Sequence, residues 1–264
     1  MNCRSQEFEL TLELRLVEEA ALAILHTVLL HRTTGRFSYQ REGTYSVGAI
    51  GCCDVDCERL GSTYVRVASA SLDRSLRSAV TAFTDALRAC EASAGVGVGV
   101  CGTLSLEFYQ RKRCRWPFPD ECAPWEVWTL RVNLVTASSE HERLALCERA
   151  AEAVGERIVN VASVMGRHEF TPKMPIQGEL RRVFDTEHGE AQPYRHRLSL
   201  AVTTTSSSSS GGSGGGHSAG GSGGGGAGAG GSGGGVGAGS VGGPQLAHCV
   251  STTVRKLIKD TLAL

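Results

Sequence analysis

The stretch from Arg111 to Trp128 constrains the fold most, because it holds all three tryptophans of the chain. Trp116 and Phe118 each stand directly before a proline, whose ring excludes the helical region for the preceding residue and keeps it extended. No helical or strand periodicity would bury both rings. The stretch therefore predicts a stiff protrusion whose tip aromatics, with Pro117 between them, are candidates for binding a partner protein.

The alternative is that Trp116 and Phe118 fold back and cover the core of their own domain. Two aromatics that are each fixed by a proline are an unusual way to fill a core, so exposure is the favoured interpretation. Burial of an exposed tryptophan on a partner can dominate an interface, and truncation then costs about 2 kcal/mol or more. Trp125 and Trp128 are expected to belong to the strand that supports the protrusion.

Residues 206–243 are almost entirely Gly and Ser. Such a tract has no side chains that could offset the entropy of ordering it, so we expect it to be disordered. Because only a short segment follows it, the tract is interpreted as an insertion within one domain. The expected organisation is a domain core at 1–205, the disordered insertion at 206–243 and a C-terminal segment of the same domain at 244–264.

Charge and hydropathy argue against several classes of protein. Lys+Arg and Asp+Glu both number 27, so nothing global suggests a nucleic-acid partner. The N-terminus lacks the apolar run of a signal peptide, and no stretch approaches the roughly 18 to 20 apolar residues of a membrane span. We therefore expect a cytosolic or nuclear protein without integral membrane association, whose ten cysteines are reduced thiols.

Alternating apolar and polar residues predict the strands of an α+β domain. The strands at 103–110 and 128–134 are expected to be antiparallel neighbours, with 111–124 as a long tip between them. Residues 92–102 are expected to form a flexible glycine-rich loop, and Asp54 and Asp56 to lie in a turn. Further strands are expected at 8–14, at 37–50 in short pieces broken by Gly43 and Gly48, at 63–67 and at 196–202.

Helical periodicity predicts three long helices, which span about 17–34, 72–90 and 139–165. Gly35 can close the first helix, and Ser71 is a plausible N-cap for the second. Ser139 and Glu142 fit a capping box at the start of the third. The apolar strip of this third helix, from 144 to 165, is expected to pack against another element throughout its length.

Two groups of cysteines, at 52–57 and at Cys114 and Cys122, raise the alternative of a zinc or thiol enzyme. No CxxC pair occurs, although paired thiolates are what make zinc motifs specific. The histidines form no HxxxH pair, and the chain has no GxxxxGK[ST] or GxSxG motif. Because no nucleophile, base and oxyanion donor can be assigned, the sequence predicts no catalytic residue, no metal site and no cofactor.

Four basic residues lie beside the aromatic protrusion. Arg111, Lys112, Arg113 and Arg115 could approach anionic lipid, at about 1 kcal/mol per charge near a membrane surface. The simpler interpretation, a solvated hairpin base, is favoured.

Several segments together resemble the autophagy-related protein 101 family. The most specific are RWPF at 115–118 and PWEVW at 124–128. The resemblance runs from end to end, through MNCRS at 1–5, LHTVLLHRTTG at 25–35, EGTYSVG at 42–48, DVDC at 54–57, SLEFYQRK at 105–112, RHEFTPKMP at 167–175 and KLIKDTLAL at 256–264.

The resemblance implies a HORMA domain, with a small antiparallel sheet, three main helices and a C-terminal belt region. It also implies no enzymatic activity. Family members are HORMA-domain subunits of the autophagy-initiating kinase complex, which contains the kinase and a large scaffold subunit. They form a heterodimer with the HORMA domain of autophagy-related protein 13, and the expected location is the cytoplasm, at the phagophore assembly site.

Two sites follow from the resemblance. The exposed Trp and Phe of the family, which match Trp116 and Phe118, recruit downstream autophagy factors. The family's C-terminal segment, which matches about 250–264, is implicated in contact with the class III phosphatidylinositol 3-kinase complex; the candidate residues here are Lys256, Leu257, Ile258 and Leu262. The Gly/Ser tract and the loop at 92–102 depart from the family, and a HORMA adaptor acting outside autophagy remains an alternative.

Overall fold

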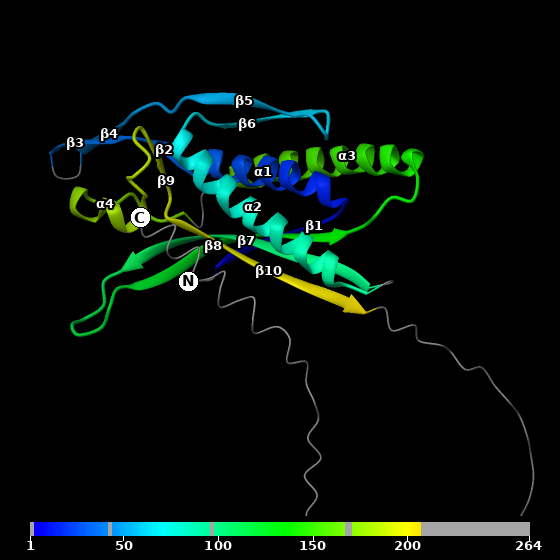
Figure 1. Cartoon of the computed structure of the whole chain (residues 1–264). Helices are drawn as coiled ribbons and strands as arrows, with labels where there is room; N and C mark the ends of the chain where they lie inside the picture. Colours follow the sequence, from blue (N-terminus) through cyan, green and yellow to red (C-terminus); the bar gives the residue numbers. More distant parts are fainter. Residues whose placement is uncertain (1–2, 42–43, 96–97, 167–170, 207–264) are drawn as a thin grey trace, which may run out of the picture.

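The computed structural model describes residues 3–41, 44–95, 98–166 and 171–206 (Figure 1). The last described strand extends to Ser206, the first residue of the Gly/Ser tract. The rest of the tract and the C-terminal segment lie outside the described residues, and so do the four candidate contact residues Lys256, Leu257, Ile258 and Leu262.

The described chain contains both helices and strands. In order they are β1 (Arg4–Leu12), α1 (Leu14–His31), β2 (Thr33–Gly35), β3 (Phe37–Arg41), β4 (Thr44–Val47), β5 (Cys52–Cys57), β6 (Ser62–Val67), α2 (Ala70–Ser93), β7 (Val98–Lys112), β8 (Glu121–Leu134), α3 (Glu140–Met165), η2 (Gln177–Glu179), α4 (Leu180–Val183), β9 (Ala191–Pro193) and β10 (His196–Ser206).

The main sheet has four strands in the order β1-β8-β7-β10. The predicted antiparallel pairing of β7 with β8 is confirmed, and β10 also runs antiparallel to β7. The expectation of an antiparallel sheet is wrong at one edge, however, because β1 pairs with β8 in parallel. A parallel pair needs a long crossover connection, and the chain between β1 and β8 supplies one through α1 and α2.

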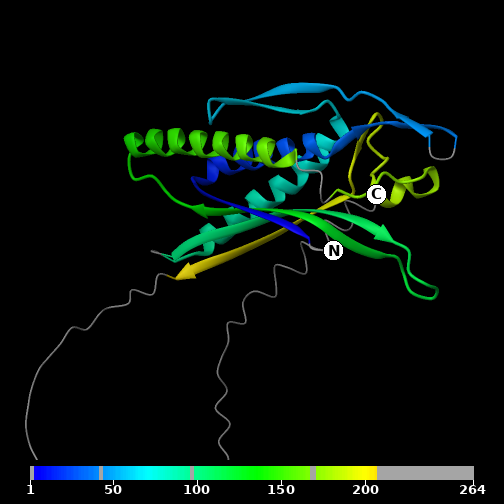
Figure 2. The same ribbon diagram turned by 180° about the vertical axis from the view of Figure 1, so that it is seen from behind.

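The described elements form three layers (Figures 1 and 2). The main sheet lies on one side, α1, α2 and α3 cover one of its faces, and the β5–β6 hairpin lies over the helices on the far side. The other face of the sheet has polar residues at alternating positions, such as Glu7, Glu9 and Thr11 on β1. This arrangement confirms a mixed α+β architecture with three main helices.

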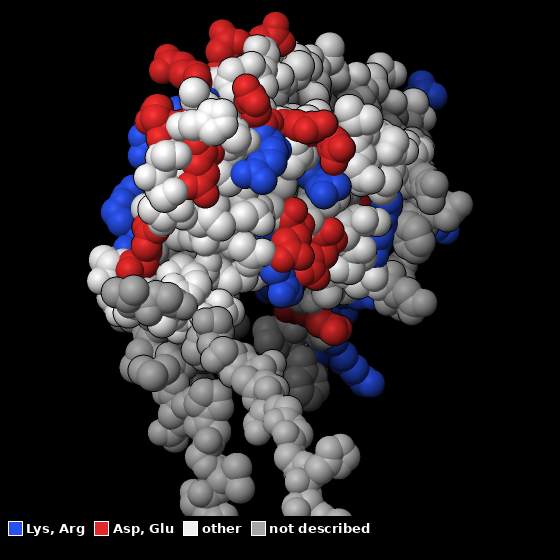
Figure 3. Space-filling model, turned by 90° about the vertical axis from the view of Figure 1, so that its right-hand side faces the viewer, with Lys and Arg blue, Asp and Glu red and all other residues white. Residues whose placement is uncertain are grey.

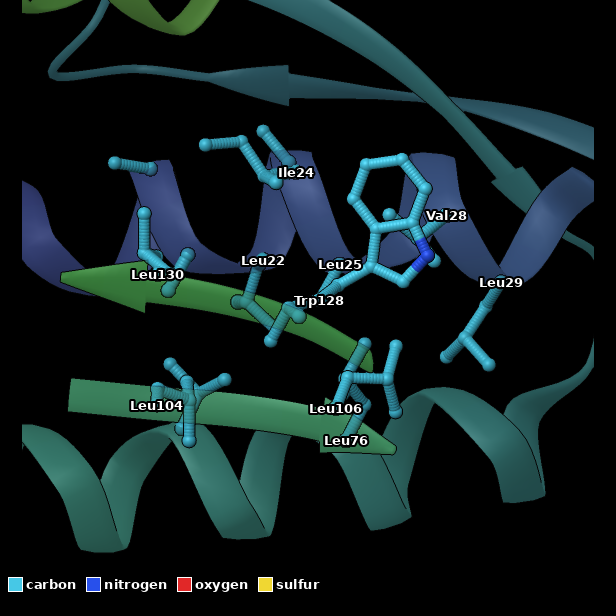
Figure 4. Packing of buried hydrophobic residues seen from close by; sticks show 14 of the residues in the cluster. Leu22, Ile24, Leu25, Val28, Leu29, Leu76, Leu104, Leu106, Trp128 and Leu130 are labelled. Carbon is cyan, nitrogen blue, oxygen red and sulfur yellow. The ribbon is translucent and has the colours of Figure 1, made fainter. Parts of the chain in front are cut away.

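α1 is buried almost all round, because it lies between the sheet, the other helices and β6. Every residue from Ala20 to Leu29 is buried, which is the pattern of a central helix and not of an amphipathic surface helix. Trp128 points from β8 toward α1 and lies beside Val28 (Figure 4). The same close-up shows Leu106 of β7 facing Leu76 of α2, so one apolar core joins the sheet to both helices.

Three predicted helix ends need correction. α1 starts at Leu14, so this residue is helical and does not extend the preceding strand. The helix ends at His31 and is not closed by Gly35, which belongs to β2. The N-cap of α2 is Ser69, whose hydroxyl accepts a hydrogen bond from the Leu72 amide; Ser71 lies inside the helix. Ser139 is the N-cap of α3, as predicted.

Two predicted loops are strands. Residues 98–102 belong to β7, because they pair with β10 on one side and residues 101 and 102 pair with β8 on the other. Asp54 and Asp56 lie on β5 and not in a turn, since Cys52–Cys57 pair along their whole length with β6. For residues 98–102, a partner from a distant part of the chain overrides a weak local strand signal, whereas β5 pairs with β6, the next strand along the chain, in a hairpin.

The apolar strip of α3 does not pack throughout. Leu144 near its start is 58% exposed, whereas Val154, Val161 and Met165 are buried. α3 contacts α1 and β1, and its burial is concentrated toward its C-terminal end. The periodic pattern therefore predicted the helix correctly and overstated the length of its contact.

Candidate functional site

β7 and β8 form a two-stranded ribbon that extends beyond the main sheet (Figures 1 and 2). Their pairing continues to Lys112 and Glu121, so the unpaired tip is 113–120 and shorter than the expected 111–124. At the tip, the Phe118 amide donates a hydrogen bond to the Arg115 carbonyl at 3.1 Å, and the Trp116–Pro117 peptide is cis. The tip is a compact turn on a paired base.

The two tip aromatics stand in solvent. Trp116 is 90% exposed and Phe118 is 71% exposed, the highest fractions among the exposed large apolar residues of the described chain. The interpretation that these rings cover their own core is therefore wrong for the isolated chain, and the favoured expectation of exposure is confirmed.

The other two tryptophans anchor the ribbon, as predicted. Trp125 and Trp128 are both buried. The pairing register shifts between Phe108 and Tyr109, so that Phe108 pairs with Glu126 and Tyr109 with Pro124. Trp125 is the extra residue of this β-bulge, which explains how two consecutive residues, Trp125 and Glu126, are both buried on a strand.

An aromatic cluster fixes the base of the ribbon. The ring of Trp125 lies 5.6 Å from that of Phe108 and meets Tyr194 edge-on at 5.1 Å. Tyr194 in turn lies 4.4 Å from Phe184. Rings at these separations attract one another beyond the effect of buried area, by about 0.5 to 1.5 kcal/mol a pair. Tyr194, which lies before β10 in the chain, therefore packs against the base of the ribbon.

A buried ion pair lies beneath the same cluster. The Glu126 carboxylate accepts hydrogen bonds from Nε and Nη2 of Arg32, at 2.6 and 3.1 Å, and both side chains are buried. Arg4 approaches the same carboxylate at 3.8 Å. The guanidinium carbon of Arg32 also lies 5.8 Å from the centre of the Trp125 ring. These contacts tie β1 and the end of α1 to the ribbon base.

The four basic residues beside the tip are all exposed: Arg111, Lys112, Arg113 and Arg115. Arg111 pairs in register with Cys122 and Lys112 with Glu121, so their side chains point to opposite faces of the ribbon. Acidic residues are close by, because Asp120 lies at the tip and forms a 3.8 Å ion pair with Arg182 of α4. The patch therefore extends over both faces of the ribbon, and Asp120 is paired with Arg182 and not with the patch.

Three of the described cysteines are poor candidates for a reactive thiol. Burial raises the pKa of Cys57, Cys101 and Cys3 above that of an ordinary thiol, which disfavours the thiolate needed for nucleophilic attack or metal binding. In the described part of the chain, no group of three or more His, Cys, Asp and Glu side chains is placed to hold a metal ion. Within the same residues, no helix is both long and apolar enough to cross a membrane.

Sequence reasoning found the tip but missed its support. Neither Arg32 nor Glu126 was singled out, because an ion pair between residues so far apart in the chain leaves no local pattern. The only available signal was a glutamate between two tryptophans, Trp125 and Trp128, where a solvent-facing charge is unexpected. The polar pocket beside β5, described below, was missed because β5 was interpreted as a turn.

Comparison with known proteins gives a consistent result. The family model for Autophagy-related protein 101 matches residues 9–178. The chain is 46% identical to the Autophagy-related protein 101 of Xenopus tropicalis, and equally to those of Bos taurus and Homo sapiens, over the full length of both chains in each case. A match of this extent covers the ribbon, the three main helices and the main sheet. The chain belongs to the autophagy-related protein 101 family.

Proposed function

We propose that this autophagy-related chain is a non-catalytic HORMA adaptor of the autophagy-initiating kinase complex, and that its tip recruits downstream autophagy factors. One observation carries the recruiting role: Trp116 and Phe118 are 90% and 71% exposed at the end of a ribbon whose base is buried. Exposed aromatic pairs of this kind are typical anchors of protein interfaces. Pro117 between them limits the number of conformations that binding must freeze out.

The rigid base is part of this argument. A binding element that is already ordered loses little conformational entropy when a partner docks. Trp125, Glu126 and Trp128 are all buried, and the strands on either side of the tip are paired up to Lys112 and Glu121. The tip can therefore present its two rings to a partner without refolding.

The second part of the proposal concerns assembly. The chain forms a heterodimer with the HORMA domain of autophagy-related protein 13 and stabilises it within the complex that contains the kinase and its large scaffold subunit. Membership of the autophagy-related protein 101 family supports this part. The complex works in the cytoplasm at the phagophore assembly site, and the segment with Lys256, Leu257, Ile258 and Leu262 contacts the class III phosphatidylinositol 3-kinase complex.

The recruiting role is tested with the double variant Trp116→Ala/Phe118→Ala in the full chain. The variant should lose downstream autophagy factors in co-purification from cells while it retains the HORMA partner. A matched control, Met174→Ala/Ile176→Ala, removes two exposed apolar side chains elsewhere and should retain both. Unchanged recruitment by the tip variant would contradict the proposal.

The assembly role is tested separately. Purified chain and purified HORMA domain of autophagy-related protein 13 should elute together in size-exclusion chromatography as a one-to-one complex. Elution of this chain as a monomer at micromolar concentration of both proteins would contradict the heterodimer and leave the tip's role standing. A set of co-purified proteins without autophagy factors would instead favour a HORMA adaptor acting outside autophagy.

Two further possibilities have simple tests. Contact of Arg111, Lys112, Arg113 and Arg115 with lipid predicts co-sedimentation with vesicles rich in phosphatidylserine and none with phosphatidylcholine vesicles. A cysteine-based zinc enzyme predicts stoichiometric zinc in the purified protein. Zinc-free protein with ten alkylatable thiols would contradict it.

A further inference from the structure

A polar pocket is lined by α1, α2 and the β5–β6 hairpin. This hairpin lies on the side of α1 that faces away from the main sheet. α1 contributes Glu18 and Glu19, the β5–β6 hairpin contributes Asp56, Glu58 and Tyr64, and α2 contributes Arg77. We propose that this pocket binds a lysine or arginine side chain of a partner protein. The turn of the β5–β6 hairpin, which lines the pocket, and the turn between β7 and β8 lie at opposite ends of the molecule in both ribbon views, so this inference does not depend on the tip (Figures 1 and 2).

The charge of the pocket favours a cation. Four carboxylates line it, against the two guanidinium groups of Arg59 and Arg77. Both guanidinium groups have acceptors outside the lining: Nε of Arg77 lies 3.1 Å from each oxygen of Asp73, and Arg59 donates to the Arg15 carbonyl at 3.0 Å. Figure 3 shows many acidic side chains on the upper and central parts of this side of the molecule, with a few basic side chains among them. The lining therefore carries more negative than positive charge, although Arg77 offsets part of the charge of Glu18.

Two of the carboxylates already have partners. Glu19 accepts the backbone amides of Arg59 and Leu60 at 3.0 and 3.1 Å, and Asp56 accepts the Thr63 hydroxyl at 2.7 Å. The bonds to Glu19 hold the hairpin turn against α1, and the bond to Asp56 joins β5 to β6, so both carboxylates have a structural role. The carboxylates of Glu19 and Asp56 still contribute negative charge to the pocket, but these hydrogen bonds fix their positions.

The other two carboxylates belong to Glu18 and Glu58. Within the described residues, neither makes a hydrogen bond or an ion pair, although the charge of Glu18 acts on the Arg77 guanidinium at a longer range. A carboxylate pair of this kind can accept the N–H donors of an ammonium or guanidinium group. They are the principal acceptors of the proposed site.

Tyr64 supplies an independent observation. Its side chain is only 4% exposed, yet its hydroxyl has no hydrogen-bond partner among the described residues. The ring is held in place by stacking on His26, with centroids 5.7 Å apart and planes at 20°. Burial raises the pKa of Tyr64 to about 12, so the hydroxyl stays neutral and can accept an N–H from a cation. A bound lysine or arginine would satisfy this buried polar group.

The shape of the pocket indicates a side chain and not a free small molecule. Glu58 and Arg59 are exposed at the rim, so the pocket is open to solvent. Sites for free ligands bury most of the ligand surface, about 70 to 90% of it. A side chain carried by a partner is positioned by the rest of the interface and does not need such enclosure.

The test is an NMR titration of the full chain with the amides of Nα-acetyl-lysine and Nα-acetyl-arginine, whose side chains keep their charge. The titration is followed at the backbone amides of Glu18, Glu19, Arg59 and Leu60. We expect saturable shifts with a dissociation constant on the order of 1 mM, and weaker binding at high salt. N-acetyl-norleucine amide, which has a similar length and no charge, should cause no saturable shift.

Three variants assign the effect to the pocket. Tyr64→Phe removes only a hydroxyl that is unpaired in the free protein, so it should weaken binding without lowering thermal stability. Glu18→Gln and Glu58→Gln should each weaken binding about fivefold, which corresponds to about 1 kcal/mol at 25 °C. Glu121→Gln, at the opposite end of the molecule, should leave binding unchanged.

Four results would overturn the inference. They are the absence of saturable shifts with either cationic amide, an equal response to the norleucine amide, unchanged affinity in all three pocket variants, and tight binding of spermidine without binding of the capped amino acids. The last result would assign the pocket to a free polyamine.

Discussion

At the scale of single residues, Glu126 carries the clearest prediction. Its buried carboxylate is paired with Arg32, and substitution by Gln would leave the guanidinium buried without a counter-charge. Breaking a buried pair on one side typically costs about 3 to 5 kcal/mol. We therefore expect Glu126→Gln to lower the free energy of unfolding by that amount in urea denaturation.

The control for Glu126 is the exposed ion pair between Asp85 and Arg88. Surface pairs of this kind contribute about 0 to 1 kcal/mol, so Asp85→Asn should hardly change the unfolding free energy. A loss from Glu126→Gln no larger than that from Asp85→Asn would show that the buried pair does not stabilise the ribbon base.

His26 predicts a pH dependence of stability. Burial lowers its pKa from 6.5 to about 4, an effect that the nearby Asp73 carboxylate only partly opposes; Arg66 and Arg77 also lower it. Between these values the unfolded chain binds a proton that the folded chain does not. Stability should therefore fall as the pH drops from about 6.5 to 4, by about 3 kcal/mol from this residue, with no further loss from it below pH 4.

The pH dependence can be measured by urea unfolding at several pH values between 7 and 4. Burial also lowers the pKa of His31 and His196, so both contribute with the same sign. His26→Gln should flatten the profile, whereas the substitution His141→Gln, at an exposed position on α3, should leave it unchanged. Profiles of equal slope for the His26→Gln variant and the unsubstituted chain would contradict the assignment.

At the scale of elements, the close approach of β7 to α2 depends on Gly102. A Cβ atom there would lie 2.7 Å from side-chain atoms of both Phe83 and Leu87. Overpacking of this kind costs about 1 to 3 kcal/mol, so Gly102→Ala should lower the melting temperature. The matched substitution Gly155→Ala, on α3 where a Cβ meets no described atom within 4 Å, should raise stability by about 0.5 to 1 kcal/mol. Equal effects of the two would exclude packing as the cause.

Elements with strong local signals could be predicted from the sequence, whereas elements that depend on contacts between distant segments could not. Strong periodicity identified β1, α1 and α3, and the Ser139 cap, because these signals are local. The start of β7 could not be predicted, because a run of Gly and Val is typical of a loop. It forms a strand here because it packs against Phe83 and Leu87 of α2 and pairs with the neighbouring strands. The parallel pairing of β1 with β8 depends likewise on contacts between distant segments.

At the scale of the whole molecule, the two candidate binding sites differ in whether they could be predicted from the sequence. The tip was predictable because each proline keeps the residue directly before it extended, which is a local effect. Trp116 and Phe118 are indeed exposed. The pocket was not, because its carboxylates come from α1 and from the β5–β6 hairpin, and its buried Tyr64 hydroxyl is recognisable only in three dimensions. Sites built from one segment can be read from sequence, whereas sites built between segments need the fold.

The central claim is that the two tip aromatics serve binding and not folding, and the melting temperature of Trp116→Ala/Phe118→Ala tests it most directly. Trp128→Ala serves as the control, because this buried ring should cost about 3 to 5 kcal/mol when removed. We predict that the tip variant melts within about 1 °C of the unsubstituted chain while the control melts much lower. A fall of roughly 10 °C or more in the tip variant would show that both rings are buried in the folded protein, and would contradict the claim.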